Sequence, residues 1–187
     1  MGRFADTGVV NNNPITDEAA GNMKRRHLIL GGAAVATLGA CSPSKFKRYN
    51  GPEVTAVVVN KGARKMYLLN DKRVLKEYDI FLGFAPTGHK EIEGDGKTPE
   101  GLYRIDRRNP NSRFHLSLGI SYPNAQDIAH ARSLGKSPGG EIFIHGQKHF
   151  LRLDKDDWTW GCISVTNKEM ERIYAMVKDG TPIAINP

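Results

Sequence analysis

The sequence has few of the features that identify disulfide-rich or membrane-spanning proteins. Only two cysteines, Cys41 and Cys162, occur in its 187 residues, which excludes a small domain held together by many disulfides. No apolar run reaches the roughly 18 residues that a membrane-spanning helix needs, so a protein with several such helices is also excluded. Internal repeats and low-complexity segments are absent from the sequence, which excludes a collagen-like chain.

The residues that are present fit an ordinary globular domain. Hydrophobic residues make up 39% and charged residues 25% of the chain, and both values are close to the averages of globular proteins. The length permits one or two domains, of which one is the simpler interpretation. The formal net charge of +7 favours an anionic environment, although charge alone does not distinguish nucleic acid from a membrane or an acidic polymer.

The N-terminal region has the order of segments found in exported proteins. Residues 1–22 are polar and aperiodic, and we interpret them as an extension that is either not translated or disordered. Met23 then begins a basic segment, Lys24-Arg25-Arg26, which is followed by an apolar stretch from Leu28 to Ala40. A basic segment, a short apolar segment and small residues before a cleavage point are the pattern of a signal peptide, which we place at 23–41.

The signal peptide ends in a sequence, Leu38-Gly39-Ala40-Cys41, that resembles the lipobox of bacterial lipoproteins. In such proteins the cysteine is diacylated and becomes the mature N-terminus. We therefore expect lipidation at Cys41, a tether over 42–52, and a lipid-anchored lipoprotein in the cell envelope, facing the periplasm. The alternative is an ordinary signal peptide with a chance cysteine. Because the protein leaves the cytoplasm in either case, nucleic acid is not an expected partner.

Lipidation at Cys41 would leave Cys162 as a single thiol in a compartment that oxidises thiol pairs. An unpaired cysteine in an exported protein suggests a reactive thiol. Two alternatives remain open at this point: a buried inert cysteine, or a disulfide between Cys41 and Cys162.

Residues 53–187 have the pattern of a mainly β domain. Short segments rich in β-branched and aromatic residues alternate with turn signals, and the first three predict an antiparallel meander. We expect a β-sandwich or barrel with a few short helices and a C-terminal helix followed by a strand. The expected strands are Val54–Asn60, Lys65–Leu69, Val74–Leu82, Gly101–Ile105, Phe114–Ser121, Glu141–His145 and Ile183–Ile185, and the expected first helix is Ala125–Leu134.

The last helix is the best-defined element of the sequence. Thr166 and Glu169 have the spacing of a capping box. Gly180 suits the position that follows a helix end, and Pro182 prevents continuation of the helix. The apolar residues between these signals recur at the period of one buried helix face, and they are Met170, Ile173, Tyr174 and Val177.

Two residues of the domain can together perform acyl transfer. Cys162 follows Gly161, and His145 ends an apolar strand. An imidazole beside a thiol can take its proton and later return it to a leaving amine. The backbone N–H groups of residues 160–162 can bind a developing oxyanion. We expect such a cysteine to have a lowered pKa and to react with iodoacetamide well below about pH 8.

The residues around this pair resemble the signature of YkuD-type L,D-transpeptidase catalytic domains. That signature is a His-Gly pair, here His145-Gly146, followed after a similar interval by Ser/Thr-x-Gly-Cys, here Thr159 to Cys162. Gly94 to Tyr103 is similar to the family's Thr-Pro-x-Gly-x-Tyr stretch, and the chain looks most like the YafK-like murein L,D-transpeptidase branch. Three further segments resemble that branch, namely His115–Leu118, Ser121–Asn124 and Ser137–Gly140.

The resemblance implies a mechanism and a substrate. Cys162 would be the nucleophile and His145 the base and then the acid. The Gly146 carbonyl would orient the imidazole, and the Gly161 and Cys162 amides would form the oxyanion hole. The thiolate would attack the central diamino acid of a peptidoglycan stem tetrapeptide, expel the terminal D-alanine and leave a thioester. An amine would then resolve the thioester in cell-wall remodelling, and no metal or organic cofactor is implied.

Four further residues are candidates for substrate contact, namely His115, Tyr122, Trp160 and Ser164. Two of them are departures from the family: many members have arginine where this chain has Ser164, and some have histidine where it has Trp160. The missing arginine, which can hold a substrate carboxylate, puts the usual donor and acceptor in doubt but not the thiol chemistry. His115 can equally be structural, Tyr122 can belong to a turn, and Trp160 can serve packing.

Three other functions remain as alternatives. Water could resolve the thioester, which would make the protein an L,D-carboxypeptidase or an amidase that releases an outer-membrane lipoprotein linked to a stem peptide. A zinc site of His145, His149 and Cys162, with Asp154, Asp156 and Asp157 nearby, would need a regular ligand spacing that the sequence does not supply. A non-catalytic module could bind anionic wall polymer through its basic face, but such a module would have no need of Cys162 and His145.

Overall fold

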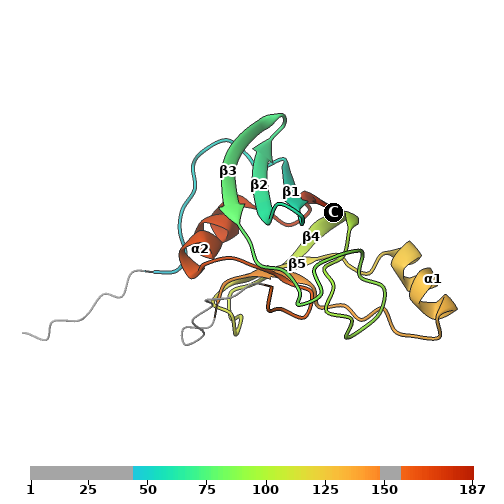
Figure 1. The fold of residues 1–187 in the computed structure, drawn as a ribbon. Coiled ribbons are helices and arrows are strands. Elements are labelled where there is room, and N and C mark those ends of the chain that lie inside the picture. The colour runs from blue at the N-terminus through green and yellow to red at the C-terminus, as the bar shows by residue number, and fades with distance from the viewer. Residues whose placement is uncertain (1–43, 148–156) are drawn as a thin grey trace, which may run out of the picture. The chain divides into compact units, whose positions relative to one another are not determined.

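The structure is a computed structural model that describes residues 44–147 and 157–187. The strands are β1 Ala56–Asn60, β2 Lys65–Asn70, β3 Arg73–Asp79, β4 Gly101–Asn109, β5 Ser117–Ile120, β6 Phe143–His145, β7 Ile163–Ser164 and β8 Pro182–Asn186, and the helices are α1 Ala125–Ser133 and α2 Asn167–Met176. The strands form one mixed sheet in the order β3-β2-β1-β8-β4-β5-β6-β7 (Figure 1). The predicted mainly β fold, with a C-terminal helix followed by a strand, is confirmed.

The first three strands form the predicted antiparallel meander. β1 pairs with β2, and β2 pairs with β3. Alternate residues of β1 and β2 are buried, because successive side chains of a strand point to opposite faces of the sheet. β8 runs parallel to β1, so the last strand of the chain lies in the middle of the sheet and joins the meander to the other strands.

β4 connects the two halves of the sheet. Its first residues, Gly101 to Arg104, pair with β8, and its later residues, Ile105 to Asn109, pair with β5. The register shifts between Ile105 and Arg107, and an irregularity of this kind bends a strand. The strand expected at 101–105 is therefore longer than the sequence predicted, and its second half starts the part of the sheet that carries the candidate site.

Both helices begin at capping boxes. In α2 the Thr166 side chain accepts a hydrogen bond from the Glu169 N–H, as the spacing predicted. In α1 the Asn124 side chain accepts from the Asp127 N–H, and the Asp127 carboxylate accepts in return from the Asn124 N–H. These reciprocal bonds satisfy backbone donors that would otherwise have no partner at a helix start.

The predicted end of the last helix is wrong. α2 ends at Met176, because its C-cap Val177 is extended, with φ −91° and ψ 132°. Gly180, with φ +87°, lies in the turn that follows, where its N–H donates to the Ile105 carbonyl oxygen at 2.7 Å. A hydrogen bond to the sheet therefore fixes the position of Gly180, and the helix ends before the position that this glycine indicated.

α2 supports the strands that carry the candidate site. Its Met170 and Ile173 are completely buried, and the helix contacts β5 and β6 (Figure 1). Within the described residues, neither helix has the length and apolar content needed to cross a bilayer.

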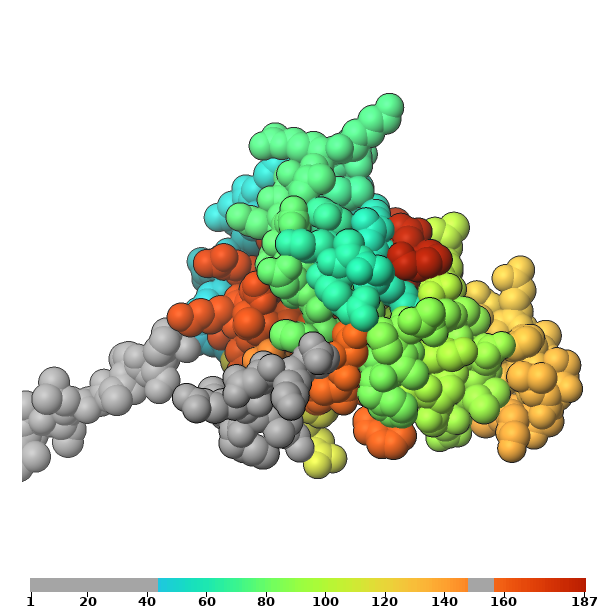
Figure 2. Space-filling view, in the orientation of Figure 1, coloured from blue at the N-terminus to red at the C-terminus, as the bar shows by residue number. Residues whose placement is uncertain are grey.

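The strand β7 was not predicted, because two residues are too few to show an alternating pattern. It pairs in parallel with β6. Bridges from Phe81 to Ser164 and from Gly83 to Thr159 attach the segment around it to the chain that follows β3. In Figure 2 the green surface that includes the loop 85–100 adjoins the orange surface around residue 160, and Gly161 indeed packs against the Lys97 carbonyl.

Candidate active site

A short turn places Cys162 directly before β7. The Thr159 hydroxyl accepts a hydrogen bond from the Gly161 N–H at 3.2 Å and donates one to the Cys162 carbonyl oxygen at 2.7 Å. Thr159 itself is 3% exposed, and its backbone is hydrogen-bonded to Leu82 and Phe84. The turn that presents the cysteine is therefore fixed on both sides.

Gly161 allows this turn to pack closely against the loop 85–100. Its φ of +117° lies in a region that other residues rarely adopt, and a Cβ there would lie 2.5 Å from the Lys97 carbonyl oxygen. The Gly161 N–H is directed at Thr159. This N–H was expected to help form the oxyanion hole, but it would have to give up its bond to Thr159 in order to bind a substrate oxygen.

The Cys162 thiol faces the segment that leads into β6. Its Sγ donates to the Glu141 carbonyl oxygen at 3.5 Å. Glu141 has φ +55°, a conformation that costs free energy for a residue other than glycine. β6 and β7 run parallel, with Ile144 opposite Ile163. His145 thus ends β6, and Cys162 directly precedes the neighbouring strand β7.

His145 is held in one tautomer and one orientation. Its Nδ1 lies 2.6 Å from the Gly146 carbonyl oxygen, so the Nδ1–H donates there and Nε2 carries the lone pair in the neutral ring. The Phe114 ring lies 4.5 Å from the imidazole, centroid to centroid, and the Trp158 ring meets it edge-on at 5.7 Å. These contacts bury the histidine to 4% exposure.

Burial decides the charge of both groups. It lowers the pKa of His145 below its ordinary value, although the bond to Gly146 opposes the change. It raises the pKa of Cys162 to about 11, and the Glu141 carboxylate adds to the rise, whereas the Phe143 N–H and the Lys90 charge oppose it. The expectation of a lowered thiol pKa is therefore wrong for the protein without substrate, in which a neutral thiol faces the same cavity as a neutral imidazole.

Two cavities meet at Cys162. The smaller, of about 440 Å³, is lined by both Cys162 and His145, together with Phe114 and Arg113. The larger, of about 760 Å³, lies between the loop 85–100 and the segment 137–141 and includes Trp160. Cys162 and Glu141 line both cavities. The thiol is thus accessible from two directions, although its side chain is largely surrounded by protein.

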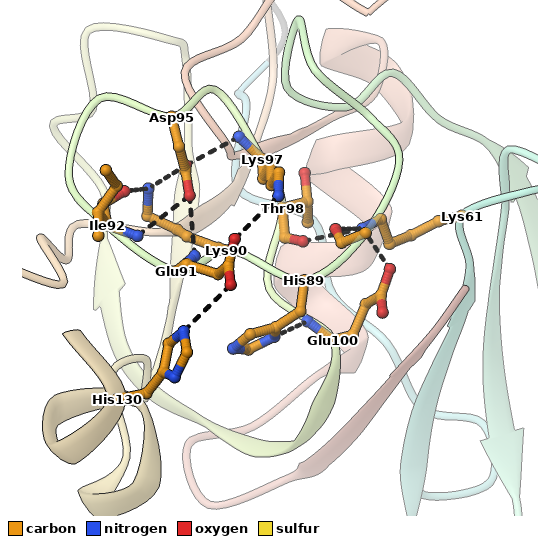
Figure 3. Close-up of polar contacts among 11 residues, drawn as sticks. Lys61, His89, Lys90, Glu91, Ile92, Asp95, Lys97, Thr98, Glu100 and His130 are labelled. Carbon is orange, nitrogen blue, oxygen red and sulfur yellow. Dashed lines mark hydrogen bonds and ion pairs between the residues drawn. The ribbon is translucent and has the colours of Figure 1, made fainter. Parts of the chain in front are cut away.

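A buried lysine holds both ends of the loop 85–100, which forms one wall of the larger cavity. Lys61 is 2% exposed and donates to the carbonyl oxygens of Gly88 at 2.6 Å and Thr98 at 2.9 Å. It also donates to Glu100 Oε1 at 2.7 Å (Figure 3). An ammonium group has three donors, so each N–H of Lys61 has a partner.

Asp95 organises the middle of this loop. Its carboxylate accepts from the backbone N–H groups of Glu91, Ile92 and Lys97 and from Lys90 Nζ at 2.9 Å (Figure 3). Burial opposes ionisation, but the Lys90 ammonium and the three N–H donors together lower the pKa of Asp95. The charge of Lys90, which lines the larger cavity, is therefore compensated within the loop.

The structure brings some of the predicted substrate contacts to the cavities and not others. Trp160, 72% exposed, lines the larger cavity next to Cys162. Ser164 was expected to contact substrate, but it is completely buried in β7. His115 Nε2 lies 3.0 Å from Glu171 Oε1 on α2, and the buried Tyr122 donates its hydroxyl proton to the Pro138 carbonyl oxygen. Both of these residues serve the structure rather than line the cavity around the thiol.

Several residues that build the site have no distinctive signal in the sequence. Phe114 and Glu141 lie outside the motifs that contain Cys162 and His145, and no local pattern connects them with the site. Thr159 lies within the motif, but its double hydrogen bond depends on the fold of the turn. The sequence signal that could have pointed to Thr159 is the run 158–162, in which aromatic residues, a threonine and a glycine precede the cysteine.

Some predictions fall outside the described residues, among them lipidation of Cys41, the extension at 1–22 and the signal peptide at 23–41. His149, proposed as a zinc ligand in one alternative, also lies outside them. Within residues 44–147 and 157–187, no group of three or more His, Cys, Asp or Glu side chains is arranged to hold a metal ion.

Comparison with known proteins agrees with the resemblance seen in the motifs. The YkuD family, described as the L,D-transpeptidase catalytic domain, matches residues 54–185. The Escherichia coli K12 protein YafK, which is named provisionally as an L,D-transpeptidase, is 32% identical over 107 residues. Those residues cover 56% of this chain and 38% of YafK.

Two solved structures share the fold. The helical cell shape determining protein Pgp2 from Campylobacter jejuni is 33% identical, with a TM-score of 0.57 over 73% of this chain and 49% of its own. Bd1075 from Bdellovibrio bacteriovorus is 25% identical, with a TM-score of 0.51 over 75% of this chain and 50% of its own. This chain thus spans half or less of each of these relatives. Because the family match covers most of its length, the chain belongs to the YkuD family of L,D-transpeptidase catalytic domains.

Proposed function

We propose that this protein is a cysteine-dependent acyltransferase that acts on peptidoglycan stem peptides, an L,D-transpeptidase that remodels the cell wall. The observation that carries the proposal is a cavity lined by both Cys162 and His145. Membership of the YkuD family supports this class of chemistry. The cell-shape role in the name of Pgp2 is consistent with action on the wall.

The first step forms a thioester. Cys162 Sγ attacks the carbonyl carbon of the central diamino acid of a stem tetrapeptide while its proton moves to Nε2 of His145. Because the pKa of His145 is lowered, the imidazole is neutral near neutral pH and can accept this proton. The tetrahedral intermediate then collapses, the C–N bond breaks, and the imidazolium returns the proton to the amine of the departing D-alanine.

The oxyanion of the tetrahedral intermediate needs a hydrogen-bond donor close to the sulfur. We assign this role to the Cys162 N–H, because the Gly161 N–H already donates to Thr159. A fixed donor is effective here, since no reorganisation is needed when the negative charge develops. The turn that Thr159 closes supplies that rigidity.

The second step resolves the thioester. An amine from another stem peptide or from an amino acid would attack the carbonyl carbon, giving its proton to His145, and the thiol would be regenerated. Once the D-alanine has left, the acceptor amine can enter the smaller cavity beside His145, while the larger cavity on the other side of Cys162 leaves space for the rest of the acyl-enzyme. Water in place of the amine would make the protein a hydrolase, which includes release of a lipoprotein attached to a stem peptide.

Mass spectrometry of muropeptides incubated with the purified protein tests the proposal. We expect a product that depends on Cys162, no product with Cys162→Ala, and loss of most activity with His145→Ala, while circular dichroism shows both variants folded. The mass of the product separates cross-links, amino-acid exchange, trimming to a tripeptide and lipoprotein release. Unaltered turnover by Cys162→Ala would contradict the nucleophile assignment, and binding of wall polymer without any product would favour the non-catalytic module.

We also propose that the protein is anchored in the cell envelope by a lipid on Cys41. Within the expected tether 42–52, Lys45 and Lys47 bond to the domain. The lipobox-like sequence before Cys41 and the wall substrate of the family support this location. Metabolic labelling with an alkyne fatty acid should tag the protein and should not tag the Cys41→Ser variant. Equal labelling of the two would contradict the anchor.

A further inference from the structure

The cavity that Cys162 and His145 share is also lined by an arginine, Arg113, that has no acidic partner among the described residues. Arg113 lies in the connection between β4 and β5, is exposed, and lines the smaller cavity. In the part of the chain that the structure describes, no hydrogen bond or ion pair is recorded for its guanidinium. Glu141, the carboxylate of the same cavity, is paired instead with Arg107 at 3.1 Å. Among the described residues that line this cavity, Arg113 therefore supplies the guanidinium that is open to an incoming carboxylate.

The backbone around Arg113 is anchored. Lys45 Nζ donates to the Pro110 carbonyl oxygen at 2.6 Å and to the His115 carbonyl oxygen at 3.1 Å, one on each side of the arginine. The Phe114 N–H donates to Ser112 Oγ at 3.2 Å. The connection that carries Arg113 is thus fixed at both ends, and this reduces the backbone entropy that must be lost when the arginine binds a ligand.

The chemistry of the reaction places the leaving group in this cavity. His145 must return its proton to the leaving amine, and His145 lines the smaller cavity but not the larger one. The residue that departs must therefore occupy the smaller cavity. When the substrate ends one residue beyond the bond that breaks, the departing residue carries a free carboxylate. A guanidinium matches a carboxylate with two parallel hydrogen bonds.

We propose that Arg113 binds the terminal carboxylate of the departing residue and so restricts the enzyme to stem peptides that end one residue beyond the attacked carbonyl. The proposal rests on the proposed function, since it assigns the leaving group of that reaction. Arg113 is then a specificity-determining residue, which holds the substrate in register with Sγ but takes no part in proton transfer.

Two substrates test this role, a stem tetrapeptide with a free C-terminus and the same peptide with a C-terminal amide. We expect the wild-type protein to prefer the free acid by about 10- to 100-fold in kcat/KM, the range given by a charge-assisted hydrogen-bonded pair. In Arg113→Ala the ratio of acid to amide should fall toward one, mainly through a higher KM for the acid. Arg113→Lys should retain part of the preference.

Arg73→Ala is the matched control, since Arg73 is an exposed arginine on β3, at the opposite end of the sheet from β7. It should keep the wild-type ratio. An equal loss on both peptides in Arg113→Ala, or a wild-type protein indifferent to the amide, would overturn the role of Arg113 while turnover still depends on Cys162. Absence of any Cys162-dependent turnover would instead refute the proposed function itself.

Discussion

Replacing Lys61 with methionine tests how far the loop 85–100 depends on one buried charge. Lys61 is 2% exposed and donates to Gly88, Thr98 and Glu100. Methionine keeps most of the apolar volume, so the loss comes from the acceptors left without a donor. Removing one partner of a buried pair costs about 3–5 kcal/mol, and we expect about 3 kcal/mol, since Glu100, 19% exposed, can still reach water.

Urea unfolding measures this change as a lower midpoint at an unchanged slope. Lys61→Met/Glu100→Gln should recover part of the loss, because it removes the unpaired carboxylate. The control is Lys178→Met, which breaks an exposed pair with Glu53 whose side chains are 73% and 61% exposed, and which should change the midpoint within the error of the measurement. A loss below about 0.5 kcal/mol in Lys61→Met would refute the reasoning, because that is the range of ordinary surface substitutions.

Three further predictions concern the site itself. Because burial raises the pKa of Cys162 to about 11, iodoacetamide should alkylate the free protein slowly near neutral pH and faster as the pH rises toward that value; a rate that levels off below pH 9 would contradict the neutral thiol. The pKa of His145 lies below its ordinary value of 6.5, so the imidazole stays largely unprotonated down to that pH. We therefore expect kcat/KM to decline only below pH 6.5. An acid limb centred above pH 6.5 would contradict the assignment of His145 as the base. Gly161→Ala should reduce stability by about 2–4 kcal/mol and abolish activity, since it combines a positive φ with a Cβ 2.5 Å from Lys97 O. Gly94→Ala, with φ +82° and open space around it, should cost only about 1 kcal/mol in urea unfolding, and equal losses in the two variants would mean that the contact with Lys97 is unimportant.

The regular elements of the fold could be read from local patterns. The alternation of β1 and β2 and the capping spacing of Thr166 and Glu169 each arise from neighbours within a few residues, and the structure confirms them. β7 escaped detection because two residues carry no period. The end of α2 was misplaced because the extended Val177 and the hydrogen bond from Gly180 to Ile105 depend on the sheet.

The ionisation of the site also escaped prediction. A cysteine and a histidine in a motif suggest an activated thiol, but the pKa of each depends on how much water reaches it. Phe114 and Trp158 enclose the imidazole, and burial raises the pKa of Cys162. Phe114 is distant in sequence from both His145 and Cys162, and Glu141 lies 21 residues before Cys162, so their proximity to the site follows from strand pairing.

The sequence by itself determined the family, most of the strands, and the two side chains able to perform acyl chemistry, because motifs and hydrophobic periods are properties of contiguous residues. The tertiary structure decided which residues share the cavity with Cys162, which hydrogen bonds fix its turn, and that Arg113 stands there while Ser164 is buried. These outcomes depend on contacts between segments distant in sequence, and on the water those contacts exclude, neither of which any local pattern records.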